Sequence, residues 1–173
     1  EDIIRFIPTS TGTTTAGSFQ MHFDGSDVDL TSRPEGIDAM SIDATGKLIL
    51  SVKGRATVGI RPSGIIKGEK AVFLIQYNRQ FNFRNLGFHF NGVGADLSKE
   101  NIDGLWIDPI NNDHYLSVTN SFNVGGGVSG GGGTIFVCAP TSLGATTSCN
   151  YRLYWDAAAA GLTQNIDGIH IQR

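Results

Sequence analysis

The sequence predicts an all-β domain built of internally repeated four-stranded units, with very little helix. Three observations support this prediction. Short runs alternate apolar and polar residues, and the 173 residues include 23 glycines. The third is a phrase that returns about every 66 residues. Alternation with a period of two is typical of half-buried strands, whereas glycine favours turns and disfavours helices. We expect a single β domain over 1–173, with repeats at about 1–68 and 69–131 and a partial repeat at about 132–173.

The repeat is clearest in a run that begins Ile-Asp. A Pro-Thr-Ser turn segment also opens the first and third copies, where Pro8 answers Pro140 at a distance of 132 residues, twice 66. Three copies of one phrase indicate a duplicated structural unit. The Ile-Asp runs lie at 37–43, 102–108 and 166–171.

Each repeat is expected to hold four strands in a fixed order. An apolar opening run is followed by a second alternating run, then the Ile-Asp run, then a Leu-Ser run. Glycine-bearing connections at 55–70 and 121–133 follow the Leu-Ser runs, and we expect them to be long, mobile loops. The remaining expected strands are 3–8, 71–77 and 134–140 (opening), 18–23, 83–90 and 150–155 (second), and 47–52 and 114–118 (Leu-Ser).

Residues 34–51 carry a resemblance to a known family. They combine a Pro-x-Gly-apolar start, an Asp-x-x-Gly turn and a following apolar strand. This segment resembles the inner two strands of an NHL-type β-propeller blade, as found in secreted bacterial proteins. The second copy keeps the apolar spacing but has Pro-Ile-Asn-Asn at 109–112 in place of the turn. The resemblance implies sheets arranged around an axis.

The number of repeats leaves the architecture open between two forms. Closed propellers have about four to eight blades, so two and a half repeats form a ring only with further chain or with other chains. A two-layer β-sandwich accommodates the same strands in one core. The third copy stops before its Leu-Ser strand, which leaves a place that is filled either by closure within the chain or by a strand from another subunit.

Charge and hydropathy exclude two classes of partner. The net charge is −3, so the chain has no basic field to attract nucleic acid. It also contains no apolar run of about 18 residues, and we expect no membrane span.

Two cysteines, Cys138 and Cys149, flank a turn-like segment between two strand-like runs. Strands joined by such a turn can bring the thiols together, and we expect a disulfide rather than two buried free thiols. A disulfide persists in an oxidising compartment, which predicts an extracellular or cell-surface location.

Carboxylates form two groups. The first group is spaced like the ligands of a calcium loop. Its members also fit a solvated turn in which Asp side chains accept hydrogen bonds from local amides. No cofactor other than calcium is expected. The second recurs directly after isoleucine in every copy and is expected to make a repeated structural hydrogen bond. The candidate calcium ligands are Asp24, Ser26, Asp27, Asp29 and Glu35, and the recurrent carboxylates are Asp38, Asp103 and Asp167.

The sequence predicts a non-enzymatic function. The four histidines lack metal-ligand spacing and are interpreted as polar edges of strands, and no nucleophile motif occurs. We expect an extracellular structural or adhesive module that self-associates through strand edges, as a homo-oligomer or a filament subunit. The alternative is a carbohydrate-binding module of a secreted bacterial protein, with Tyr154, Trp155 and Asp156 contacting a polysaccharide.

Overall fold

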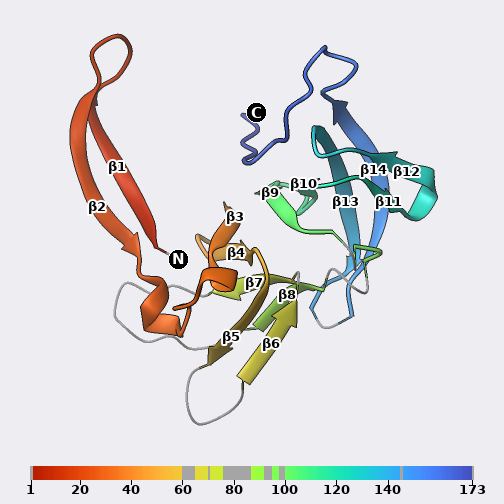
Figure 1. Cartoon of the computed structure of the whole chain (residues 1–173), viewed down its shortest axis with the longest axis horizontal. Helices are drawn as coiled ribbons and strands as arrows, with labels where there is room; N and C mark the ends of the chain where they lie inside the picture. Colours follow the sequence, from red (N-terminus) through yellow and green to blue (C-terminus); the bar gives the residue numbers. More distant parts are fainter. Residues whose placement is uncertain are drawn as a thin grey trace.

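The computed structural model is all-β, as the alternating runs predict (Figure 1). It describes residues 2–59, 65–69, 71–75, 87–91, 95–97, 100–144 and 146–172. Helix within these residues is limited to short 3-10 turns at Gly25–Val28 (η1), Arg33–Glu35 (η2) and Gly125–Gly127 (η3).

Two four-stranded antiparallel sheets have the same order along the chain. The first runs β3-β4-β7-β8 and the second β9-β10-β13-β14, so in each sheet every strand pairs with the next one listed. Each sheet takes an Ile-Asp and a Leu-Ser strand from one copy of the sequence phrase and its other two strands from the next copy. The strands are β3 Ile37–Ile42, β4 Leu48–Val52, β7 Ala71–Ile75, β8 Gly87–Asn91, β9 Ile102–Ile107, β10 His114–Val118, β13 Thr134–Ser142 and β14 Ser148–Asp156.

The glycine-bearing connections are hairpins, so the prediction of long loops was wrong. Strand β5 (Arg55–Gly59) pairs with β6 (Ile65–Glu69), and β11 (Phe122–Val124) pairs with β12 (Val128–Gly130). The second hairpin is stabilised because Phe122 and Val124 are buried in the core, while Gly126 and Gly127 adopt the positive φ that its turn requires.

The N-terminal hairpin stands apart from both sheets (Figure 1). Strand β1 (Ile3–Ser10) pairs with β2 (Ala16–Phe23), and among the described residues β1 has no second neighbour. The register places Ile4 opposite Met21 and Phe6 opposite Phe19. These four apolar side chains therefore share one face of the ribbon.

The main core lies between the two four-stranded sheets, where β3 runs beside β9. The first sheet contributes Ala39, Ile49 and Phe90, and the second contributes residues of β9, β10 and β13. Burial of these side chains is the principal favourable term in folding. The contributions of the second sheet are Ile102, Leu105, Ile107, Leu116, Val118, Phe136 and Cys138.

The third Ile-Asp run, at 166–171, is not a strand, contrary to the expectation from its sequence. No Leu-Ser strand pairs with it in the described residues, and a strand exists only where a ladder partner does. The segment is held against the second sheet instead: the Ile166 amide donates to Gly132 O, and the Asn165 side chain donates to Thr119 O.

The disulfide predicted between Cys138 and Cys149 is formed, and it joins the neighbouring strands β13 and β14. The two Cα atoms are 5.1 Å apart, and Cys138 is fully buried. Closing so short a loop stabilises the folded state by about 3 kcal/mol in the chain-entropy account.

We predict that Cys149→Ser lowers the free energy of unfolding by about 2–3 kcal/mol. The measurement is chemical denaturation with and without reductant. Reductant should lower the stability of the wild type but leave that of the variant unchanged, and an equal effect on both proteins would contradict the assignment.

Candidate functional site

Asp38 and Asp103 occupy the same special position in the two sheets. Between β3 and β4, Ile37 pairs with Val52 and Ala39 with Ser51, so Asp38 is an extra residue without a partner. Asp103 is the corresponding extra residue between β9 and β10. Such a β-bulge turns a side chain out of the strand's regular alternation.

Each bulged carboxylate accepts a hydrogen bond from a side chain. Asn101 donates from Nδ2 to Asp38 Oδ2 at 2.8 Å, which connects the first sheet to the residue before β9. The Ser117 hydroxyl lies 2.9 Å from both Asp103 Oδ1 and Ile166 O, and it shares its one hydrogen between them.

The corresponding serine in the first sheet is Ser51. It lies near Asp38 but outside hydrogen-bond geometry. The Ser51 hydroxyl and Asp38 Oδ1 are therefore buried without a partner among the described residues. A buried, unsatisfied carboxylate oxygen disfavours the charged form of Asp38.

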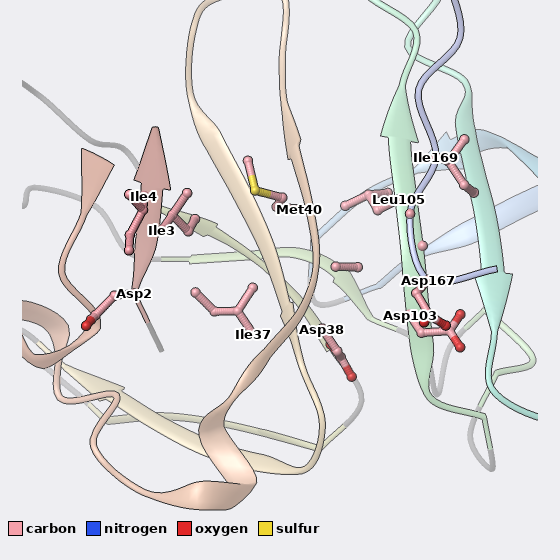
Figure 2. A pocket seen from close by; sticks show the side chains of 13 residues that line it. Asp2, Ile3, Ile4, Ile37, Asp38, Met40, Asp103, Leu105, Asp167 and Ile169 are labelled. Carbon is pink, nitrogen blue, oxygen red and sulfur yellow. The ribbon is translucent and has the colours of Figure 1, made fainter. Parts of the chain in front are cut away.

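All three recurrent carboxylates, Asp38, Asp103 and Asp167, line one cavity of about 420 Å³ (Figure 2). Three Ile-Asp runs and the start of β1 converge there. Gly104 permits the close approach of Ser117 and Ile169, because a Cβ at this position would collide with the Ser117 hydroxyl and crowd the Ile169 side chain. The other lining residues are Asp2, Ile3, Ile4, Ile37, Ala39, Met40, Gly104, Leu105, Gly168 and Ile169.

Burial dominates the electrostatics of this cavity. It raises the pKa of Asp38 to about 6, although the hydrogen bond from Asn101 acts in the opposite direction. Burial also raises the pKa of Asp103, which the bond from Ser117 lowers and the nearby charge of Asp167 raises. The cavity thus combines hydrogen-bond acceptors with an apolar wall, and its burial disfavours the ionised forms of Asp38 and Asp103.

Three of the candidate calcium ligands, Asp24, Ser26 and Glu35, make local side-chain hydrogen bonds. Asp24 accepts from the Ser26 amide and hydroxyl and so caps η1. Glu35 Oε2 accepts from the Thr31 and Ser32 amides. Asp27 and Asp29 lie in or next to the same turn. Within the described part of the chain, no group of three or more His, Cys, Asp or Glu is placed to hold a metal. Calcium binding stays a prediction.

The candidate glycan contacts lie at the end of β14. Tyr154 is the extra residue of a bulge, is half exposed, and packs edge-on against Tyr115 with ring centroids 4.8 Å apart. Trp155 is half-buried, and Asp156 accepts a hydrogen bond from the Ala158 amide. Glycan binding at these residues stays a prediction.

Sequence reasoning missed a histidine pair between the sheets. His89 of β8 and His114 of β10 approach with their Nε2 atoms 2.8 Å apart. The interpretation of His114 as a polar strand edge was wrong, because its side chain is fully buried. His114 Nδ1 donates to Asn112 O at 2.8 Å, so its Nε2 accepts from His89.

Both histidines are held neutral. Burial lowers the pKa of His114 to about 4, and burial also lowers that of His89. The charge of Asp43 raises the pKa of His89, and the charge of Lys47 lowers it. The charge of Asp113 raises the pKa of His114. No local sequence signal marks this pair, because the two residues meet only when the sheets pack.

Comparison with protein families, with curated proteins and with solved structures found no match for this chain. In the described residues, no helix has both the length and the apolar character needed to cross a membrane.

We predict that Asp38→Asn is more stable than the wild type at about pH 7 and that the difference disappears towards about pH 4. The folded-state pKa of Asp38 is raised to about 6 from 3.8. Ionisation of Asp38 therefore destabilises the wild type progressively as pH rises between these values, and asparagine has no such effect. Denaturation curves across this range measure the effect. Asp27→Asn, at an exposed position, is the matched control; equal pH dependence of the stability of the two variants would contradict the prediction.

The histidine pair should have the opposite pH dependence. The folded-state pKa of His114 lies near 4, below its ordinary 6.5. In that window the unfolded chain binds more protons, so stability rises with pH, by on the order of 3 kcal/mol for full burial of one histidine. When His114→Gln is added to the Asp38→Asn variant, the free energy of unfolding should rise less steeply with pH. An unchanged slope would contradict the assignment, whatever the variant's absolute stability.

Proposed function

We propose that this chain is a non-enzymatic, extracellular structural module that self-associates through the open strand edge and apolar face of its N-terminal hairpin. The observation that carries the proposal is a contrast in burial between two corresponding hairpins. In β1, Ile4 is 61% exposed and Phe6 is 36% exposed. Their counterparts 132 residues later, Phe136 and Cys138 of β13, are both 0% exposed.

Exposure of the apolar face of the β1–β2 hairpin to water is unfavourable. A two-stranded hairpin is at best marginally stable in water, and it gains stability when a further layer packs on it. Phe19 is 73% exposed and Met21 is 59% exposed, so they extend the same apolar face. Contiguous apolar patches of this kind mark interaction sites, and the unpaired edge of β1 adds backbone groups that can pair.

We further propose a propeller-like arrangement of repeated units. Both sheets share one strand order, and the Ile-Asp runs of three successive copies line one cavity. Convergence of the first strands on a common space favours sheets arranged around an axis over a two-layer sandwich. The NHL-type resemblance falls on β3, which lines this cavity, and on its neighbour β4.

Two features support the location and the non-enzymatic role. The disulfide is favoured in an oxidising compartment. The cavity is lined by carboxylates and apolar side chains, and two of its carboxylates already hold strands together. The alternative function, carbohydrate binding, is favoured only by the half-exposed ring of Tyr154.

We predict that the wild-type chain forms species larger than a monomer, with a mass that rises with concentration in size-exclusion chromatography with light scattering. Phe19→Lys should weaken this association at least tenfold, because it places a charge on the apolar face. Ile110→Lys is the matched control, since Ile110 is 77% exposed in the turn between β9 and β10. A wild type that stays monomeric at every concentration would overturn the proposed function.

A further inference from the structure

Both four-stranded sheets place one leucine in the same setting. This leucine belongs to the Leu-Ser strand, and it pairs with a residue of the Ile-Asp strand on one side and with a phenylalanine of the opening strand on the other. A Leu-Ser strand therefore joins an Ile-Asp strand to an opening strand in each sheet. The residues that pair in this way are Met40, Leu50 and Phe73 in the first sheet and Leu105, Leu116 and Phe136 in the second.

A third set has its two outer members but lacks the leucine between them. In the third Ile-Asp run, Ile169 corresponds to Leu105, and in β1, Ile4 corresponds to Phe136. Ile169 and Ile4 line the same cavity, which they border from different sides (Figure 2). Among the described residues, no Leu-Ser strand pairs with the 166–171 segment or with β1.

Both flanks of this place can pair with a further strand. The 166–171 segment is fixed by the bond from the Ile166 amide to Gly132 O at 3.1 Å and by the Ser117 hydroxyl, 2.9 Å from Ile166 O. Within the described residues, β1 pairs only with β2. An extended segment placed between two such flanks can form backbone hydrogen bonds with both, as in β-strand addition.

The strand that fits this place is not supplied by a second copy of residues 1–173. Both Leu-Ser strands are already paired on their two sides: β4 lies between β3 and β7, and β10 lies between β9 and β13. To release either strand would break a four-stranded sheet and expose core residues such as Ile49 and Leu116. The strand therefore comes from a separate polypeptide.

The charge of the cavity indicates which strand would bind. The described lining residues include four aspartates and no lysine or arginine. An incoming strand with basic ends is therefore electrostatically complementary, whereas an acidic strand is repelled. Strand β4 has this pattern within the chain, because its apolar residues lie between Lys47 and Lys53. The lining aspartates are Asp2, Asp38, Asp103 and Asp167.

Resting on the open β1 edge of the proposed function, we infer that β1 and the 166–171 segment form a binding site for one extended strand of a separate polypeptide. The strand carries an apolar residue between Ile169 and Ile4 and basic residues at its ends. Once bound, it completes a third sheet in the order Ile-Asp run, Leu-Ser strand, β1 and β2, which is the order of the other two sheets.

A synthetic peptide with the sequence of residues 47–53 is the probe. Fluorescence anisotropy measures binding of the labelled peptide to the full chain in dilute solution. We expect saturable binding, and at least tenfold weaker binding of the same peptide with Leu50→Pro, because proline removes a backbone donor from the strand. Equal binding of the two peptides, or no binding of either, would overturn the inference.

Two variants of the chain locate the bound peptide. Ile4→Gln should weaken binding at least tenfold, because Ile4 would pair with the central leucine. Ile110→Gln is the matched control and should leave binding unchanged, since Ile110 is 77% exposed in the turn between β9 and β10. Circular dichroism verifies that both variants are folded. Equal affinities of the two variants would place the peptide elsewhere and overturn the inference.

Hydrogen exchange of the wild type tests the two-sided character of the site. Bound peptide should slow exchange of amides in β1 and in the 166–171 segment together. Protection of only one of these flanks would overturn the inference.

The outcomes separate this inference from the proposed function. Self-association of the wild type without peptide binding would overturn the inference and leave self-association standing. Peptide binding by a chain that stays monomeric at every concentration would overturn self-association and leave the strand-binding site standing.

Discussion

The second strand of each four-stranded sheet in this protein is buried on both of its faces, so another layer covers each face of that strand. The second strands show this directly: every residue of β4 and of β10 is buried, although successive side chains point to opposite faces. One face of each sheet is covered in the shared core. The requirement explains why β3 runs beside β9, why the 166–171 segment lies against the second sheet, and why the hairpin face with Phe19 is conspicuous.

Polar bonds at the cavity set how neighbouring layers align. The apolar core supplies most of the stability but is non-directional. Asn101 to Asp38, the Ile107 amide to Ser41, and Ser117 to Ile166 O each join one unit to the next. The bulges direct Asp38 and Asp103 towards these partners. The cost is a raised carboxyl pKa and, at Asp38, an oxygen that finds no partner in the part of the chain that the structure describes. We propose that the recurrent aspartates serve alignment first.

The sequence was sufficient for most strands of the two four-stranded sheets and for the disulfide, because alternation and turn residues act locally. It could not show which strands share a sheet, because a periodic pattern can be divided into units from any starting point. The sheets begin two strands later than the sequence repeats, and this difference is not visible in the pattern. The 55–59 and 65–69 hairpin was missed because glycine there indicated a loop. Burial of His114 depends on His89 of the other sheet, and the bulges at Asp38 and Asp103 depend on strand register.

Hydrogen exchange of backbone amides, followed at low and at high protein concentration, tests most directly whether layers stabilise each other. The account predicts that amides of β10 exchange slowly at both concentrations, because both faces of that strand are covered within one molecule. Amides of β1 should exchange rapidly in dilute solution and become protected as concentration rises. Strong protection of β1 in the isolated monomer would contradict the claim that its face requires a second molecule.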